Sequence, residues 1–329
     1  MDALSELLRA VRLSGAMFFN ALCAAPWCVQ SPPSKRLGQY LAPGASHVIE
    51  FHFIAAGRCY IRVGGETTPL AAGDIVMLPH GDAHVMGNGL GSDALNSDSP
   101  AGEAAMAELL RGEVRLSRLG DGDGEETHLI CGYLACEARL LQPLLAGLPR
   151  VVRVSLHHDA YGRAIAEMIR HAVTQLGEDA PGSKAIGARL AEVLFAESLR
   201  RYLLQLPPGA SNWLAGAADH AVGRALAALH QRPAHDWTLD ELGREAGLSR
   251  SALTERFARH FGQGPMGYLT DWRLELAADA LRSSSRSVAQ IAAEVGYDSE
   301  AAFNRAFKRR FELPPARYRK HWRENNATS

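Results

Sequence analysis

The last third of the chain contains an internal repeat, and this repeat constrains the fold more than any other feature. Five positions recur at an offset of 50 residues: Leu253, Phe257, Phe261, Pro265 and Tyr268 return as Phe303, Phe307, Phe311, Pro315 and Tyr318. Upstream, LDELGREAGLS at 239–249 matches VAQIAAEVGYD at 288–298 at an offset of 49 residues. A unit that occurs twice in succession predicts two copies of one small supersecondary structure.

Each copy carries the sequence pattern of a helix, a tight turn and a second helix. The first helix of each copy begins at a capping box, a Ser or Thr followed three residues later by Glu or Gln. These boxes are Thr238 with Glu241 and Ser287 with Gln290. Gly247 and Gly296 follow at the turn, where a residue must tolerate a positive φ. In the second helices the apolar residues of the repeat lie four apart, which predicts one buried face on each.

The opposite face of each second helix is polar, and this predicts contact with DNA. An α-helix fits the major groove of B-DNA and reads base edges with polar side chains. The predicted DNA-binding residues are Arg250, Ser251, Thr254, Glu255, Glu300, Asn304, Arg305, Lys308 and Arg309. The sequence from Arg305 to Arg323 contains eight basic residues and one acid, Glu312, a composition that suits contacts with phosphates.

Residues 217–324 resemble the DNA-binding domain of AraC/XylS-type transcription regulators. The closing F…P…YR signature of that family is matched by Phe307, Phe311, Pro315, Tyr318 and Arg319. The resemblance implies double-stranded DNA as a partner, with RNA polymerase as a further one. It also implies a seven-helix domain in which one helix joins the two repeated units, and the segment 265–282 is expected to be that helix.

A second motif lies near residue 80, among short β-type stretches that are interrupted by Gly and Pro. The spacing Gly-x5-Pro-x-Gly-x2-His-x3-Asn is matched by Gly73, Pro79, Gly81, His84 and Asn88. This resembles the second motif of the cupins, small β-barrels that commonly hold a metal ion among histidines. The first cupin motif is HxH followed by Glu and Gly. Of that motif His52 and Gly57 remain in EFHFIAAGRCY, and the second His and the Glu are missing.

His52 and His84 lie on separate predicted strands and can face the same barrel interior. Strand alternation places Glu50 on the same face as His52. A neutral imidazole inside a barrel needs a partner, and a metal ion is one such partner. With the thiols of Cys131 and Cys23 as further ligands, the two histidines would complete a tetrahedral zinc site.

The front part of the chain resembles the cupin-type sensor domain of a subgroup of these regulators, which includes reactive-chlorine-responsive activators. In that subgroup an N-terminal cysteine and the cysteine of a CG strand are linked to sensing. Cys131 matches the cysteine of the CG strand. Cys23 is our candidate for the other, with Cys28 as its rival because the spacing to Trp27 differs by two residues. The resemblance therefore implies a small molecule, a metal or an oxidant as the inducer.

Together these features predict an α+β multidomain protein. The expected parts are a cupin-like β-barrel sensor domain at 1–150, a helical connector at 151–212, and an all-α double helix–turn–helix domain at 213–329. The connector contains two amphipathic helical stretches, which can cover a core or pair with a second copy in a homodimer. Pro143 and Pro149 bracket a predicted turn at the end of the sensor domain.

Three functions are compatible with these features. The first, our working hypothesis, is a transcription regulator whose barrel senses an inducer and allosterically controls the DNA-binding domain as an activator or a repressor. The second is a cupin metalloenzyme that carries a DNA-binding domain; the incomplete first motif argues against it, so we expect no enzyme. The third is a constitutive DNA-binding protein with a ligand-free barrel.

The composition limits the location that we expect for the protein. The chain has no run of about 18 apolar residues, the length that a membrane helix needs. The N-terminal segment has acids early and lacks the long apolar core of a secretory signal. We therefore expect a cytoplasmic protein without a membrane partner, whose five scattered cysteines are free thiols or ligands.

Overall fold

The structure is a computed structural model, which describes residues 2–11, 13–89, 95–96, 116–119 and 123–327. Contacts between residues divide the chain into two compact units. The barrel unit contains Leu13–Glu137 and Leu148–Gln205, and the helical unit contains Met1–Arg12, Ala138–Gly147 and Leu206–Ser329. The two predicted domain boundaries, at 150 and 212, remain predictions.

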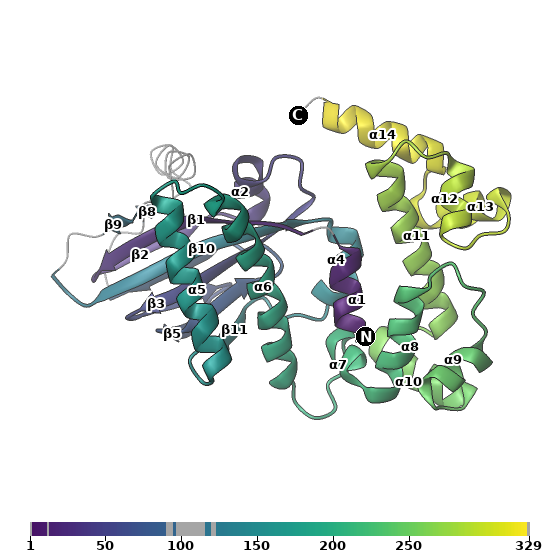
Figure 1. The fold of residues 1–329 in the computed structure, drawn as a ribbon, viewed down its shortest axis with the longest axis horizontal. Coiled ribbons are helices and arrows are strands. Elements are labelled where there is room, and N and C mark those ends of the chain that lie inside the picture. The colour runs from purple at the N-terminus through teal and green to yellow at the C-terminus, as the bar shows by residue number, and fades with distance from the viewer. Residues whose placement is uncertain (1, 12, 90–94, 97–115, 120–122, 328–329) are drawn as a thin grey trace. The chain divides into compact units, whose positions relative to one another are not determined.

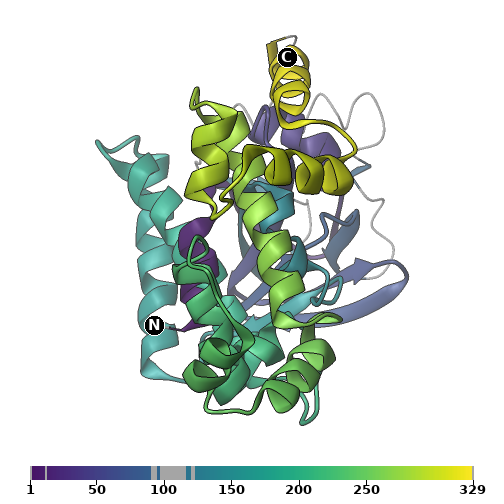
Figure 2. The same ribbon diagram turned by 90° about the vertical axis from the view of Figure 1, so that its right-hand side faces the viewer.

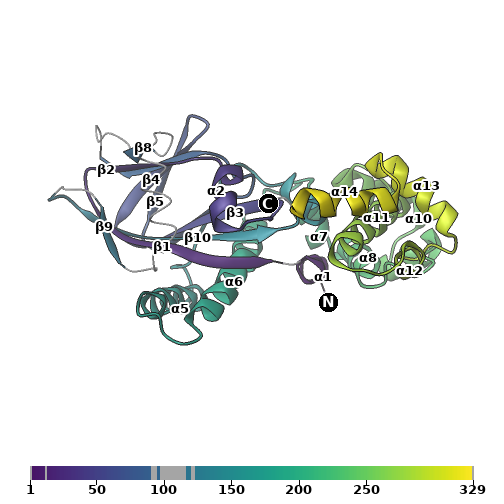
Figure 3. The ribbon, with the colours of Figure 1, turned by 90° about the horizontal axis from the view of Figure 1, so that it is seen from above.

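The barrel unit is built from two β-sheets that face each other (Figure 3). Its strands are β1 (Ser14–Ala24), β2 (Trp27–Ser31), β3 (His47–Ala56), β4 (Arg58–Val63), β5 (Glu66–Ala71), β6 (Asp74–Leu78), β7 (His84–Asn88), β8 (Leu95–Asn96), β9 (Ser117–Leu119), β10 (Glu126–Cys136) and β11 (Val152–Ser155). The larger sheet has the order β11-β6-β3-β10-β1-β9, and the smaller sheet has the order β5-β4-β7-β2-β8. Most neighbours in both sheets are antiparallel, as expected for a cupin-like barrel.

The inward residues of both sheets form one apolar core, because alternate residues of a strand point to the same face. Its largest aliphatic and aromatic members are Phe19, Trp27, Ile54, Ile61, Leu70, Leu78, Met86 and Leu129. Among the residues that the structure describes, this unit contains the helices α2 (Ser34–Leu41), α5 (Ala160–Gly177) and α6 (Ser183–Leu204). Helices α5 and α6 lie on the outer side of the larger sheet, and α6 packs on β1 and β11 (Figures 1 and 3). The predicted connector thus contributes both a strand and helices to the barrel unit.

The helical unit contains the repeated sequence. Its helices are α1 (Ala3–Ala10), α4 (Ala138–Leu145), α7 (Trp213–Ala218), α8 (His220–Gln231), α9 (Leu239–Ala246), α10 (Arg250–Phe261), α11 (Pro265–Ser283), α12 (Val288–Glu294), α13 (Glu300–Phe311) and α14 (Pro315–Ala327). Helix α11 runs between the pair α9–α10 at one end and the pair α12–α13 at the other (Figures 1 and 2). The seven helices from α8 to α14, with α11 as the joining helix, confirm the predicted double helix–turn–helix fold.

The two copies of the repeat fold into the same packing arrangement. In each copy two phenylalanine rings have centroids 4.4 Å apart, and the first of them meets a tyrosine edge-on. These residues are Phe257, Phe261 and Tyr268 in the first copy and Phe307, Phe311 and Tyr318 in the second. The predicted buried residues of the second helices, Leu253, Phe257, Phe303 and Phe307, are fully buried. Gly247 and Gly296 have φ of 68° and 87°, the left-handed conformation expected at both turns.

One of the two predicted capping boxes is complete. The box at Ser287 forms in both directions with Gln290. Thr238 accepts a hydrogen bond from the backbone N–H of Glu241, but the Glu241 carboxylate does not complete the box. It accepts a hydrogen bond from Nε2 of His235 instead, at 2.7 Å. The predicted capping box at Thr238 and Glu241 is therefore only half formed, because the ring of His235 binds the carboxylate that would complete it.

The turn that Pro143 and Pro149 were predicted to bracket is confirmed at Ala146 and Gly147, and Pro143 itself lies inside α4. The helix buries four leucines on one face: Leu140, Leu141, Leu144 and Leu145. A proline within a helix costs about 3 kcal/mol, whereas each fully buried leucine contributes roughly 1.5–3 kcal/mol. Tertiary packing therefore outweighs the local preference. Among the described residues, none of the helices combines the length and the apolar character that a membrane crossing requires.

Candidate metal centre and nucleic-acid interface

Two histidines from opposite sheets meet inside the barrel unit. His52 lies on β3, in register with Cys131 of β10, and His84 is the first residue of β7. The Nε2 atoms of the two rings are 2.9 Å apart, and both side chains are almost fully buried. Glu50, two residues before His52 on the same strand face, joins them. One ligand atom from each of the three side chains lies within 4.8 Å of the other two.

Each member of this group is held by a further residue. The glutamate accepts a hydrogen bond from Ser34 Oγ at 2.5 Å. Nδ1 of His84 lies 3.1 Å from the carbonyl oxygen of Asp82, and Nδ1 of His52 lies 2.8 Å from Sγ of Cys131. Because each Nδ1 contacts a neighbour, the rings are oriented with their Nε2 atoms toward each other, as in metal sites whose ligands are held by outer residues.

Burial keeps the two imidazoles neutral. Loss of hydration lowers the pKa of His84 to about 4. The same cause lowers the pKa of His52 well below its usual value, with the nearby His84 as a second cause. Burial also raises the pKa of Glu50 to about 7, against the opposing effect of the hydrogen bond from Ser34. Neutral imidazoles beside a carboxyl group provide the nitrogen and oxygen donors that a divalent metal ion requires.

The spacing of these donors fits one metal ion. An ion with tetrahedral bonds of about 2.1 Å separates two of its ligands by roughly 3.4 Å. The separations here bracket that value: 2.9 Å between the two Nε2 atoms and at most 4.8 Å within the group. Two histidines and one carboxylate leave a position open for water or a small molecule. Such a set suits zinc and iron(II) alike.

The predicted ligands Cys131 and Cys23 take different positions. Cys131 contacts Nδ1 of His52, the nitrogen that does not face His84. Cys23, on β1, packs in the apolar core with Cys131 and Cys59. Burial raises the pKa of Cys23 to about 12 and that of Cys131 well above its usual value. The group that the structure brings together thus contains a carboxylate where the sequence predicted thiols.

Glu50 is the member of this group that sequence reasoning did not assign. Alternation along the strand places it on the face of His52, and that was the available indication. The HxH pattern does not include Glu50, because a glutamate stands at the position two residues before His52.

The second helices of the repeat expose the polar faces that the sequence predicted. On α10, Arg250, Ser251, Thr254 and Glu255 are exposed. On α13, Glu300, Arg305, Lys308 and Arg309 are exposed, and Asn304 is half-buried. Both faces are therefore placed to meet a partner outside the protein.

On α10 the exposed side chains already have partners within the protein. Arg250 forms a two-pronged ion pair with Asp240 of α9. Glu255 pairs with Arg259 at 3.2 Å, and the hydroxyl of Thr254 donates to the carbonyl of Arg250 at 2.8 Å. Surface pairs of this kind contribute about 0–1 kcal/mol. They nevertheless compete with contacts to bases or phosphates.

On α13, four of the predicted DNA-binding side chains have no such partners among the described residues. Within the part of the chain that the structure describes, Asn304, Arg305, Lys308 and Arg309 form no hydrogen bond or ion pair through their side chains. Their donors are therefore available to base edges and phosphate oxygens.

Some of the basic residues predicted to contact phosphates stabilise the helical unit instead. Arg310 pairs with Glu275 at 3.0 Å. Arg319 donates to the carbonyl oxygens of Leu281, at 3.2 Å, and of Arg286, at 2.5 Å. Fewer of the eight basic residues at 305–323 are therefore available to phosphates than their number in the sequence indicated.

Comparison with known proteins identifies the class. A family model described as Cupin matches residues 2–204, and one described as a helix-turn-helix domain matches residues 242–321. A protein of Streptomyces antibioticus described as an AraC-like transcription regulator is 35% identical over 327 residues, which cover 98% of this chain and 99% of its own. The HTH-type transcriptional regulator MtrA of Neisseria gonorrhoeae is 27% identical over 97% of this chain and 98% of its own. The RCS-specific HTH-type transcriptional activator RclR of Escherichia coli strain K12 is 26% identical over 98% of this chain and 99% of its own.

The chain is thus a DNA-binding transcription regulator with a cupin-like N-terminal domain. More particularly, it belongs to the AraC-like regulators, as the repeat, the cupin motif and the matches over nearly its full length agree.

Proposed function

We propose that this regulator senses an inducer at Glu50, His52 and His84, and that occupancy of this site changes the affinity of the helix–turn–helix domain for DNA. The observation that supports the proposal is the convergence of three buried metal-ligating side chains in an otherwise apolar interior. Buried ionisable groups cost free energy unless a partner satisfies them. Such a cluster is therefore better explained by ligand binding than by stability.

A divalent metal ion fits this site best. Glu50, His52 and His84 would hold the ion, and when bound it would supply a Lewis-acidic position open to water or to an inducer. Ser34 would hold the carboxylate and Cys131 would orient the ring of His52. Zinc is the ion that we propose, with iron(II) as the alternative that the same donors accept.

An oxidant is a second candidate for the inducer, and the position of Cys131 favours it. Its Sγ lies 2.8 Å from the ring of His52, so a change at sulfur reaches a proposed metal ligand directly. With hypochlorous acid, for example, the thiol R–SH and HOCl would give R–SOH and HCl. The relative named an RCS-specific activator matches this chain over 326 residues, which include Cys23 and Cys131. Cys23 lies in the same core as Cys131 and is the candidate for a second sensing cysteine.

The metal proposal is tested on the purified full-length chain by elemental analysis. About one equivalent of metal per chain is expected, with loss in Glu50→Gln and in His84→Ala. His158→Ala, which alters an exposed histidine of the same unit, is the matched control and should retain the metal. A metal content that is the same in all three variants would refute this site.

The sensing role of Cys131 is tested with a duplex operator selected in vitro from random sequences. Cys131→Ser should abolish the change in operator affinity on addition of hypochlorite and leave the affinity without oxidant unchanged. Cys136→Ser replaces another buried cysteine of β10 and should respond like the wild type. An oxidant response that persists in Cys131→Ser would remove this residue from the sensor.

We also propose that α5 and α6 form a homodimer interface. Met168, Ile186 and Val193 are large apolar side chains of these helices, with 54%, 57% and 42% of their surface exposed. Light scattering should show a dimer that Ile186→Lys converts to a monomer. Arg189→Lys, on the same helix, should remain dimeric. A monomeric wild-type chain would contradict this proposal.

A further inference from the structure

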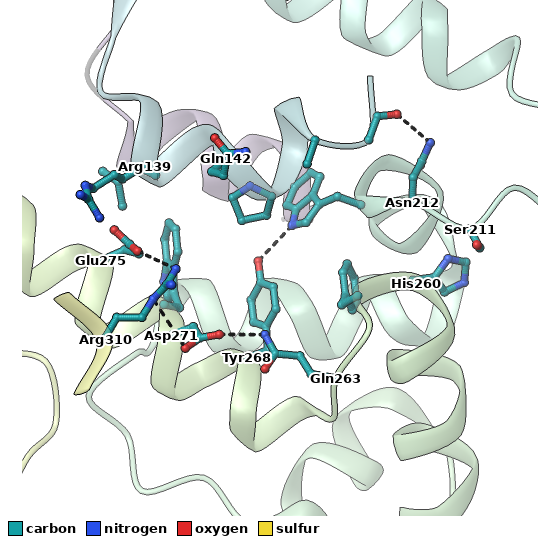
Figure 4. A pocket seen from close by; sticks show the side chains of 17 residues that line it. Arg139, Gln142, Ser211, Asn212, His260, Gln263, Tyr268, Asp271, Glu275 and Arg310 are labelled. Carbon is teal, nitrogen blue, oxygen red and sulfur yellow. Dashed lines mark hydrogen bonds and ion pairs between the residues drawn. The ribbon is translucent and has the colours of Figure 1, made fainter. Parts of the chain in front are cut away.

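The helical unit contains a cavity of about 400 Å³ to which neither the DNA interface nor the barrel site assigns a role (Figure 4). Its walls come from α4, from the residues before α7, from the end of α10 and from α11. Four of the lining side chains are aromatic: Trp213, Phe261, Tyr268 and Trp272. A cavity of this size lies in the range that holds small organic ligands, roughly 300–1,000 Å³.

Three of the lining rings, those of Trp213, Tyr268 and Trp272, are nearly parallel to the ring of His230, which lies behind them and not in the lining. His230 of α8 stacks on Trp272, with ring centroids 4.2 Å apart and an interplanar angle of 15°. Its plane is also within 16° of that of Tyr268 and within 23° of that of Trp213. The hydroxyl of Tyr268 accepts a hydrogen bond from Trp213 Nε1 at 3.0 Å, which holds the two rings together. Planar aromatic ligands stack on rings of this kind in offset geometry.

The charged side chains at the α13 end of the cavity balance one another. Arg310 pairs with Glu275 at 3.0 Å and reaches Asp271 at 4.0 Å. Arg139 of α4 adds a second cation, 5.2 Å from the centre of the Phe311 ring. Two cations and two carboxylates leave no net charge, so neither an anionic nor a cationic ligand is favoured over a neutral one.

Two polar atoms of lining residues have unused hydrogen-bonding capacity. Trp272 Nε1 and Glu275 Oε2 are buried and, among the described residues, have no hydrogen-bond partner. A buried polar group without a partner costs about 1–3 kcal/mol. An occupant that carries a hydroxyl or amide group could reduce this cost after a small side-chain adjustment.

We infer that this cavity binds a flat, uncharged aromatic molecule of two or three fused rings that carries one hydrogen-bonding group. Such an occupant contacts His260 and Phe261 in the last turn of α10 and Arg310 in the last turn of α13. It therefore touches both second helices of the repeat at once. The inference does not depend on the metal proposed for the barrel.

The test uses isothermal titration of the full-length chain with three naphthalenes whose substituents at position 2 are neutral, anionic and cationic. These probes are 2-naphthol, 2-naphthoate and 2-naphthylmethylammonium. We expect saturable binding of 2-naphthol, and at least tenfold weaker binding of both charged analogues. No saturable binding of 2-naphthol, or tighter binding of a charged analogue, would overturn the inference.

A cavity-filling variant locates the binding. Ala146 is exposed and lines the cavity, so Ala146→Trp can place an indole in it without disturbing the core. Ala164→Trp makes the same change at an exposed position of α5 and is the matched control. Binding of 2-naphthol should be lost in Ala146→Trp and kept in Ala164→Trp, with melting temperatures close to that of the wild type. Equal binding by both variants would place the probe elsewhere and refute the site.

A second variant guards against misfolding. Gln142→Trp fills the cavity from an exposed position of α4 and should also remove binding. If it keeps the wild-type melting temperature and still binds 2-naphthol as the wild type does, the assignment to this cavity fails.

Discussion

The first helix–turn–helix copy, α9 with α10, and the second copy, α12 with α13, bury apolar side chains at corresponding positions and expose different charges. The ring geometry of the two cores agrees closely, as the 4.4 Å separation of the phenylalanine pair in each copy shows. On the surface, Arg250 of the first copy is paired with Asp240, whereas Arg305 and Lys308 of the second have no ion-pair partner among the described residues. A repeated core therefore preserves the backbone, while each exposed face can serve DNA differently.

The largest expected effect tests whether the two cores are equivalent. Phe257→Ala and Phe307→Ala each remove a fully buried ring, so each should lower the free energy of unfolding by about 3–5 kcal/mol. Urea denaturation followed by circular dichroism measures both. If the two losses of unfolding free energy differ by more than about 2 kcal/mol, the two cores are packed differently although their ring geometry matches.

The next effect tests the difference between the two surfaces. Arg305→Ala should weaken binding to the selected operator by about 1–3 kcal/mol if this side chain reaches a base edge. Arg250→Ala should cost less, because Arg250 must first leave its ion pair with Asp240. Fluorescence anisotropy at several salt concentrations measures both variants. If Arg305→Ala weakens binding to the operator and to unrelated DNA sequences by the same factor, Arg305 contacts a phosphate and not a base.

Removing the carboxylate of Asp240, the ion-pair partner of Arg250, is a second test of the difference between the two surfaces. Asp240→Asn releases Arg250, which can then contact a phosphate. The slope of log affinity against log salt concentration should therefore become steeper by about one unit. Glu294→Gln removes the partner of Arg286 in the second copy and is the matched control. If Arg250→Ala loses more operator affinity than Arg305→Ala, the first copy and not the second makes the stronger contact with DNA.

A smaller difference is expected at the two turns. Alanine at either glycine would adopt a positive φ, which costs roughly 1–2 kcal/mol. At Gly247 the added Cβ would lie 3.0 Å from the flexible guanidinium of Arg224, and at Gly296 it would lie 2.7 Å from the backbone Cα of Ala234. Gly296→Ala should therefore be the more destabilising variant, by about 1 kcal/mol in thermal or urea unfolding. A larger cost at Gly247 would mean that the backbone near Ala234 yields more easily than the side chain of Arg224.

The smallest effect concerns protonation, which distinguishes the tyrosines of the two copies. Tyr268 lies 2.9 Å from Nε2 of the buried His230, whereas Tyr318 accepts a hydrogen bond from Arg282 at 2.7 Å. Burial lowers the pKa of His230 to about 3, below its usual 6.5. Between those values the unfolded chain binds a proton that the folded chain does not. This histidine's contribution to stability is therefore complete above pH 6.5 and is lost as the pH falls toward 3.

We expect a loss of about 1 kcal/mol between pH 6.5 and pH 5.5 from this residue, because one unit of pKa shift corresponds to about 1.4 kcal/mol. Urea unfolding at both pH values measures it, and His230→Gln should show a shallower pH dependence. An unchanged dependence in that variant would assign the acid sensitivity to other groups.

The sequence determined the features that rest on residues close together in the chain. The caps, the turn glycines and the four-residue spacing of apolar side chains act within one or two helical turns, so both copies of the repeat could be predicted from them. The cupin motif around His84 is local in the same way. By contrast, the partners of His52, the ion pair of Arg250 with Asp240, and the helix around Pro143 depended on packing.

Only the tertiary structure decided which distant groups meet. Glu50 and His84 lie on strands of different sheets, and the cavity is lined by residues from 139 to 310. No spacing rule connects such residues, because their separation depends on how sheets and helices pack and not on the path of the chain between them. Burial then sets the charge of those groups, as the lowered pKa of His84 shows.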